Sequence, residues 1–117
     1  MEPPKPIREE RPWGEYIEFT RNTPSTVKII TVKPHEALSL QWHHNRDEFW
    51  HVISGTGTIT KGMETFPAKP GDQFFLPRTA NHRVEADDKP FVFLEIALGD
   101  AAETDIVRLD DKYGRES

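Results

Sequence analysis

Residues 38–55 read LSLQWHHNRDEFWHVISG, and they predict two short β-strands, 38–43 and 48–54, joined by a turn through 45–47. Aromatic and β-branched residues favour strands, and no convincing amphipathic helix is visible in the chain. Pro and Gly divide the remaining sequence into similar short pieces. The other candidate strands are residues 15–20, 27–32, 57–61, 64–68, 73–76, 82–86, 91–98 and 105–109. Evenly spaced short strands between turn residues predict an all-β protein, an antiparallel sandwich or barrel.

Length and composition limit what the chain can be. Its 117 residues suit one domain, predicted over residues 11–109, with a flexible Pro-rich arm at 1–10 and a charged tail at 110–117. No cysteine is present, which excludes disulfides and thiolate chemistry. No apolar run approaches the roughly 20 residues that cross a bilayer, so we expect a cytoplasmic protein without membrane contact. The net charge of −5 argues against nucleic-acid binding.

Four side chains from three stretches form a candidate metal site. Side chains alternate between the faces of a strand, so Gln41 and His43 are expected to point the same way. If the strands on either side of the turn are neighbours, Glu48 joins them, and His82 comes from the start of another strand. Two imidazoles, one carboxylate and one amide oxygen suit one divalent ion: zinc is the first choice, with Mn, Co, Fe or Ni as alternatives. The competing interpretation is that these groups are solvated or hydrogen-bonded without a metal.

The spacing of these residues resembles the two signature motifs of the cupins. The first motif reads His35-x5-Gln41-x-His43-x4-Glu48-x6-Gly55 here, and the second reads Gly71-x5-Pro77-x-Thr79-x2-His82-x3-Ala86. The chain departs from the cupin pattern at four positions: His35 and Thr79 replace Gly, Gln41 replaces His, and Ala86 replaces Asn. The resemblance implies a cupin double-stranded β-helix, a jelly-roll barrel.

Gln41 and its flanking segments resemble the type II phosphomannose isomerase (mannose-6-phosphate isomerase) domain. The matching pieces are RPWG at 11–14, Lys28, VKP at 32–34, LSLQWHHNR at 38–46, EFW at 48–50, SGT at 54–56, DIVRL at 105–109 and YGR at 113–115. The resemblance implies a metal-dependent aldose–ketose isomerase that interconverts mannose 6-phosphate and fructose 6-phosphate through an enediol. Many relatives carry a sugar-nucleotide guanylyltransferase before this domain, but no nucleotide-binding Gly-rich loop is visible here, so we expect no guanylyl transfer from this chain.

The candidate catalytic residues are Glu95 and Arg83. Alternation in the apolar strand 91–98 predicts that Glu95 faces the cavity, where burial would raise its pKa as a general base requires. Glu95 could instead pair with an arginine as structural support. Arg83 flanks the ligand His82, although its side chain is expected to start on the opposite face of the strand.

A phosphate ester requires cationic donors, and arginine offers two parallel ones. Arg46 and Arg78 are predicted to lie in loops at the mouth of the barrel, and Lys28 occupies a position that matches the family. These three are the candidate substrate-binding residues, and a solvated surface cation is the alternative for each.

Two other functions stay open at this stage. His43, Glu48 and His82 also form the two-His-one-carboxylate set of an Fe(II)-dependent dioxygenase. A non-catalytic cupin that binds a sugar or a metal is the third hypothesis. Under each of them the expected partner is a small molecule, a sugar phosphate under the first, and the family analogy predicts a homodimer that pairs through sheet edges.

Overall fold

The computed structural model describes residues 5–99, 105–111 and 113–114, and in them every regular element is a β-strand. The strands are β1 (Ile7–Arg11), β2 (Gly14–Glu18), β3 (Thr26–Val32), β4 (Leu40–Trp42), β5 (Arg46–Ser54), β6 (Gly57–Lys61), β7 (Glu64–Ala68), β8 (Gln73–Leu76), β9 (His82–Ala86), β10 (Phe91–Gly99) and β11 (Val107–Asp110). Each predicted strand is present, with ends shifted by at most a few residues. Within these ranges, no helix has the length and apolar character needed to cross a membrane.

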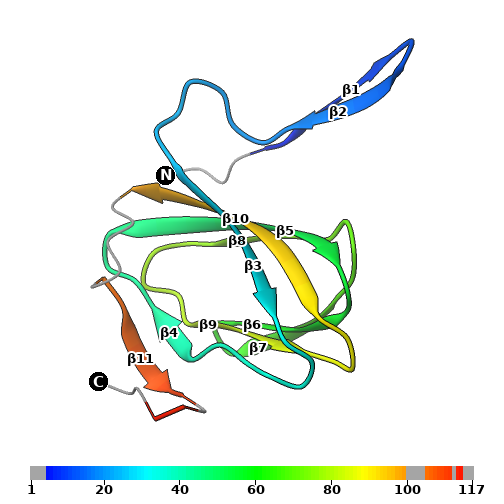
Figure 1. Cartoon of the computed structure of the whole chain (residues 1–117). Coiled ribbons are helices and arrows are strands. Elements are labelled where there is room, and N and C mark those ends of the chain that lie inside the picture. The colour runs from blue at the N-terminus through cyan, green and yellow to red at the C-terminus, as the bar shows by residue number, and fades with distance from the viewer. Residues whose placement is uncertain (1–4, 100–104, 112, 115–117) are drawn as a thin grey trace.

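Two antiparallel sheets face each other and form the barrel (Figure 1). One sheet has the strand order β3-β10-β5-β8 and the other has the order β11-β4-β9-β6-β7. The third sheet, a two-stranded ribbon of β1 and β2, projects away from the barrel (Figure 1). The all-β, double-stranded β-helix prediction is therefore confirmed.

The interior changes from apolar to polar along the strands. In β10, Phe91 and Phe93 are fully buried, and Glu95 is the next residue on the same face. In β9, the fully buried Val84 is preceded on that face by His82. Because side chains alternate with a period of two, each strand contributes to an apolar core at one end of the barrel and to polar groups at the other.

The predicted adjacency of the strands on either side of the 45–47 turn is wrong. β4 pairs with β9 and β11, whereas β5 pairs with β10 and β8 in the opposite sheet. The carboxylate of Asp105 accepts hydrogen bonds from the backbone N–H groups of His44 and Asn45, each at 2.9 Å, and so holds the chain where it crosses between the sheets. Gln41, His43 and Glu48 therefore approach one another across the barrel rather than along a hairpin.

Within the arm predicted at residues 1–10, the residues from Ile7 onward form strand β1, which pairs with β2 over its whole length. An Arg8–Glu15 ion pair and Arg11, which lies 5.2 Å from the ring centroid of Tyr16, connect the two strands. Residues 1–4 of the arm, and residues 112 and 115–117 of the predicted tail, lie outside the described residues. The limits of the predicted domain stay a prediction.

Two turns have the positive φ angle typical of glycine at a residue that is not glycine. His35 and Thr79 stand where the cupin motifs have Gly, and they adopt φ values of 61° and 70°. Positive φ is uncommon for residues with a Cβ atom and is strained for a β-branched one. Gly55 shows why one motif glycine is required: its φ is 79°, and a Cβ atom would lie 2.1 Å from the carbonyl oxygen of Pro90.

Candidate metal centre and cavity

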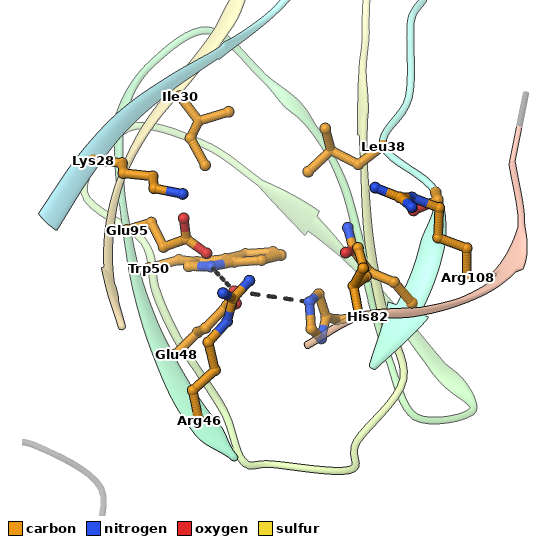
Figure 2. A pocket seen from close by; sticks show the side chains of 12 residues that line it. Lys28, Ile30, Leu38, Arg46, Glu48, Trp50, His82, Glu95 and Arg108 are labelled. Atoms are coloured by element: carbon orange, nitrogen blue, oxygen red, sulfur yellow. Dashed lines mark hydrogen bonds and ion pairs between the residues drawn. The ribbon is translucent and has the colours of Figure 1, made fainter. Parts of the chain in front are cut away.

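A cavity of about 180 Å³ lies between the two sheets (Figure 2). Its lining comes from both sheets and from the segments that lead into β4 and β11: Lys28, Ile30, Leu38, Ser39, Gln41, Arg46, Glu48, Trp50, His82, Glu95, Ile106 and Arg108. This set includes three of the four predicted metal ligands, the predicted base Glu95, and two of the three predicted substrate-binding residues, Lys28 and Arg46.

Strand register explains how distant residues meet here. On the five-stranded sheet, Arg108 pairs with Gln41, and Gln41 pairs with His82. On the four-stranded sheet, Glu95 pairs with both Lys28 and Trp50. Directly paired residues on adjacent strands present their side chains on the same face. Each sheet therefore presents a row of three side chains to the cavity.

His43, Glu48 and His82 form a buried cluster with the composition of a metal site. One ligand atom from each lies within 4.8 Å of the others. Nε2 of His43 is 3.0 Å from Oε2 of Glu48, and Nε2 of His82 is 3.7 Å from Oε1. The three residues are exposed by only 1–3%. An exposed acidic patch is therefore not the explanation for this cluster, and its nitrogen and carboxylate donors suit a divalent cation.

Hydrogen bonds orient both imidazoles for this role. Nδ1 of His43 donates to the carbonyl oxygen of Asp105 at 2.6 Å, and Nδ1 of His82 donates to that of Ala80 at 3.2 Å. A carbonyl oxygen can only accept, so the proton lies on Nδ1 and the lone pair of a neutral ring lies on Nε2. Both Nε2 atoms face Glu48. Metal-binding histidines typically donate one ring N–H to a carbonyl oxygen, as these two do, and bind the ion through the other nitrogen.

The local pKa values favour the ligand forms of these groups. Burial lowers the pKa of His82 to about 4, despite the opposing charge of Glu48, so its ring is neutral at pH 7. Burial is the largest influence on the pKa of Glu48 and would raise it, but the contacts of Glu48 with His43, Glu95 and His82 together outweigh burial and hold that pKa below its usual range. Neutral imidazole and ionised carboxylate are the forms that bind metals.

Arg46 lies at the cluster rather than in a loop at the barrel mouth. It is the first residue of β5, and its Nε donates to Oε2 of Glu48 at 2.9 Å. Its Nη2 donates to Nε2 of His43 at 3.1 Å. A guanidinium can only donate, so Oε2 of Glu48 and Nε2 of His43 both act as acceptors here. These two electron-rich atoms already converge on one positively charged group. The donor set thus fits the predicted metal.

Glu95 faces the cavity as predicted and is 7% exposed. Burial, followed by the hydrogen bond to Glu48 and the charge of Glu48, raises the pKa of Glu95 to about 8. Two neighbouring carboxyl groups therefore differ in protonation, because Glu48 holds the charge and Glu95 holds the proton. Trp50 completes this wall, and its Nε1 donates to Oε1 of Glu48 at 3.0 Å.

The structure does not bring Arg83 or Arg78 into the cavity, contrary to the roles expected of them. Arg83 points to the other face of β9, as alternation requires, and donates to the carbonyl oxygens of Leu38 and Asp110, each at 2.9 Å. The side chain of Arg78 is 47% exposed and forms an ion pair with Asp47 at 3.4 Å. Arg83 thus connects β9 to the segment before β4 and to the end of β11, and Arg78 connects the segment after β8 to β5.

Sequence reasoning missed two contributors from the segment around β11. Arg108 lines the cavity, and Asp105 holds both His43 and the crossing between the sheets. Alternation within 105–109 placed Ile106 and Arg108 on one face, which was a usable signal. No pattern within residues 105–109 indicated that this strand pairs with β4, so the sequence did not show which face of the strand points into the cavity.

Comparison with known proteins identifies the family. Residues 6–111 match the family model described as mannose-6-phosphate isomerase C-terminal. The chain is 41% identical over 107 residues to the xanthan biosynthesis protein XanB of Xanthomonas campestris, covering 90% of this chain and 23% of that protein. It is 39% identical over 107 residues to the mannose-1-phosphate guanylyltransferase ManC of Salmonella typhimurium, covering 90% of this chain and 22% of that protein. The chain thus spans less than a quarter of these relatives.

Solved structures agree on the fold. A putative sugar phosphate isomerase from Acidithiobacillus ferrooxidans is 29% identical with a TM-score of 0.58, covering 62% of this chain and 49% of that one. Bacillus subtilis oxalate decarboxylase, described with Mn(II) centres, is 32% identical with a TM-score of 0.66, covering 74% of this chain and 24% of that one. A cupin protein from Bacteroides fragilis is 23% identical with a TM-score of 0.61. The match covers 68% of this chain and 70% of that one. The chain therefore has the cupin fold and belongs to the mannose-6-phosphate isomerase C-terminal family.

Proposed function

We propose that this chain is a metal-dependent aldose–ketose isomerase that interconverts mannose 6-phosphate and fructose 6-phosphate. The observation that carries the proposal is the buried His43–Glu48–His82 cluster beside the protonated Glu95 in one cavity, in a chain of this family. Isomerisation moves a proton between C1 and C2, so it requires a proton carrier next to a group that stabilises negative charge.

The proposed metal ligands are His43, Glu48 and His82, with Gln41 as a fourth. Gln41 lines the same cavity and pairs with His82, so its amide oxygen is on the correct face. When bound, a divalent cation acts as a Lewis acid that stabilises negative charge on the substrate oxygens. Zinc is the first choice, and Mn, Co, Fe or Ni suit the same donors.

Glu95 is the proposed proton carrier between C1 and C2. Its pKa near 8 lies close to the working pH, where a general base is most efficient. A cation bound at the neighbouring cluster would favour the ionised form of Glu95, and the ionised carboxylate is the form that acts as a base. It then takes the proton from one carbon and returns it to the other, with the enediol as intermediate.

One observation favours a second candidate, a non-catalytic sugar- or metal-binding domain. Several similar proteins are named as mannose-1-phosphate guanylyltransferases, and this chain matches less than a quarter of each. A domain of that kind would bind a sugar phosphate or a cation without turnover. The two candidates differ in one measurable property, the exchange of the C2 proton with solvent.

The test is a coupled isomerase assay on metal-stripped protein that is reconstituted with one cation at a time, without oxygen. We expect turnover only with cation, with exchange of the C2 proton into solvent. Glu95→Gln should bind the cation normally and lose about 10²- to 10⁴-fold in kcat. Cation binding by the wild type with no turnover and no exchange would contradict the isomerase and favour the binding domain. Activity that requires oxygen and Fe(II) would favour the dioxygenase.

The remaining expectations belong to the same proposal. A homodimer that pairs through sheet edges, and a cytoplasmic location, are expected for this isomerase. Sedimentation velocity of the full chain measures the first, and a single species with the mass of the 13.5 kDa monomer would contradict it.

A further inference from the structure

Arg108 is the cavity residue that the proposed chemistry leaves without a role. It comes from β11 at the edge of the five-stranded sheet, and its guanidinium turns toward the cavity on the wall opposite Lys28 and Glu95 (Figure 2). Its Nε atom is buried and has no hydrogen-bond partner, the one such side-chain nitrogen or oxygen in the described part of the chain. Leaving a buried charged donor without a partner is costly, so such a donor indicates that a partner is supplied by something else.

The surroundings of Arg108 show what kind of partner is missing. The carboxylates that line the cavity, Glu48 and Glu95, both belong to the four-stranded sheet. Glu48 is already paired with Arg46 at 2.9 Å. The cavity residues contributed by the five-stranded sheet and the segments leading into it carry no carboxylate: Leu38, Ser39, Gln41, His82, Ile106 and Arg108. An arginine among neutral neighbours in a cavity is suited to bind an anion from outside the protein.

The position of Arg108 relative to the metal cluster suits a sugar phosphate. Register places Arg108, Gln41 and His82 in one row, so two strand spacings of about 4.8 Å each separate the backbone of Arg108 from that of His82. In a hexose 6-phosphate the reacting carbons are at one end of the molecule and the phosphate is at the other. Such a substrate can lie along the row, with its phosphate at Arg108 and its reacting carbons near His82.

We propose that Arg108 binds the phosphate group of the substrate, with Lys28 on the facing sheet as a second positive charge. This assignment rests on the proposed function for the identity of the ligand. The planar guanidinium offers parallel N–H donors that match two phosphate oxygens, and its Nε–H is one of them. The phosphate thereby sets the distance between the anchored end of the sugar and the metal cluster, which makes Arg108 a specificity-determining residue.

The first test measures binding without turnover. Inorganic phosphate is titrated into the full metal-free chain and followed by ³¹P NMR, with wild type, Arg108→Gln, Arg108→Lys and the matched surface control Arg21→Gln. A charge-assisted hydrogen bond contributes about 1.5–3 kcal/mol, so we expect Arg108→Gln to weaken phosphate binding about 10- to 100-fold. Lysine keeps the charge without the fork and should be intermediate, and Arg21→Gln should bind as wild type does. Wild-type affinity in a folded Arg108→Gln protein would overturn the assignment.

A second measurement needs no variant and so does not depend on whether Arg108→Gln folds. In ¹H–¹⁵N spectra of the wild type, the Arg108 Nε–H signal should move downfield as phosphate is added. An Nε–H signal that does not respond to saturating phosphate would also overturn the proposal.

Kinetics separate the failure of this assignment from the failure of the proposed function. If the chain is an isomerase, Arg108→Gln should raise KM for mannose 6-phosphate about 10- to 100-fold with a much smaller effect on kcat. Isomerisation with an unchanged KM would overturn the role of Arg108 while the function stands. Phosphate binding that depends on Arg108 in a chain without isomerase activity would support the role of Arg108 and contradict the function.

Discussion

Glu48 and Glu95 face the same cavity from neighbouring strands, yet their environments move their pKa values in opposite directions. Glu48 accepts hydrogen bonds from Arg46 and Trp50 and keeps its charge, whereas Glu95 is buried beside that charge and keeps its proton. Pairs of acids whose pKa values are separated in this way divide the roles of charged ligand and proton carrier between them. At the scale of single residues, the chemistry of this site depends on which carboxyl group receives the cationic and N–H partners.

The first prediction concerns the pH dependence of stability in the metal-free protein. The pKa of Glu95 rises from 4.5 to about 8 on folding, so between these values the folded chain binds more protons than the unfolded chain. The stability contributed by Glu95 is therefore present below pH 4.5 and lost as pH rises toward 8. Each pKa unit corresponds to about 1.4 kcal/mol. Below pH 6.5 the lowered pKa of His82 has the opposite effect on stability, so urea unfolding of the wild type with EDTA should show the decline between about pH 6.5 and 8. Glu95→Gln should have a flatter profile in that range; parallel profiles would contradict the prediction.

The second prediction concerns Thr79, an exposed β-branched residue at a φ of 70°. Glycine tolerates this conformation, but it also increases the entropy of the unfolded chain. Relief of about 1–2 kcal/mol of backbone strain outweighs that entropy. Thr79→Gly should therefore raise the free energy of unfolding by up to about 1 kcal/mol, measured by urea unfolding. Thr79→Ala, which keeps a Cβ atom, is the matched control and should gain less.

At the scale of elements, the C-terminal strand completes the site. β11 forms the edge of the five-stranded sheet and brings Arg108 to the cavity, while Asp105 just before it contacts three consecutive residues of the crossing from β4 to β5. The carbonyl oxygen of Asp105 orients the ring of His43, and the carboxylate of Asp105 accepts hydrogen bonds from the backbone N–H groups of His44 and Asn45. The metal cluster and the cavity wall thus share one support.

The third prediction tests this support. Asp105→Ala keeps the carbonyl oxygen that orients His43 but leaves the N–H groups of His44 and Asn45 without their acceptors. Those two bonds hold the backbone directly after His43, and loss of outer support around a metal ligand typically lowers metal affinity about 10- to 100-fold. Competition with a chelator should show a loss of that size for Asp105→Ala and none for Asp88→Ala, a change at an exposed position. Equal affinities in the two variants would mean that the crossing is held without Asp105.

At the scale of the whole molecule, the proposed ligands come from both sheets. His82 belongs to the five-stranded sheet, Glu48 belongs to the four-stranded sheet, and His43 lies in the connection between them. A cation held by these three groups joins the two layers of the barrel at the end that lacks the apolar core. Global stability and metal binding are therefore linked.

The fourth prediction follows from that linkage. A ligand at 100 times its dissociation constant stabilises the folded state by about 2.7 kcal/mol. Saturation with Zn²⁺ should therefore raise the Tm of the wild type by several degrees, and EDTA should reverse the rise. His82→Ala should lose the shift, whereas His51→Ala, a histidine on the other side of β5 from Glu48, should retain it. A shift of equal size in both variants would place the cation elsewhere.

Much of the site was predictable from local pattern. The alternation of side chains along a strand is a property of the backbone, so the sequence determined that Glu95 points with Phe91 and Phe93. That Gln41 and His43 share a face stays a prediction, because β4 ends at Trp42. The chemistry of the side chains likewise determined the kind of ion they suit. These inferences needed only the residues within one strand.

Only the tertiary structure decided which strands face one another. The connection from β4 to β5 crosses the barrel instead of forming a hairpin, Arg78 and Arg83 support loops and edges, and Arg108 enters the cavity. Strand pairing over long sequence separations depends on how all the strands pack together, and no signal within a single strand encodes it. The sequence by itself determined the class of fold and the donors; the packing of the two sheets determined which of them meet.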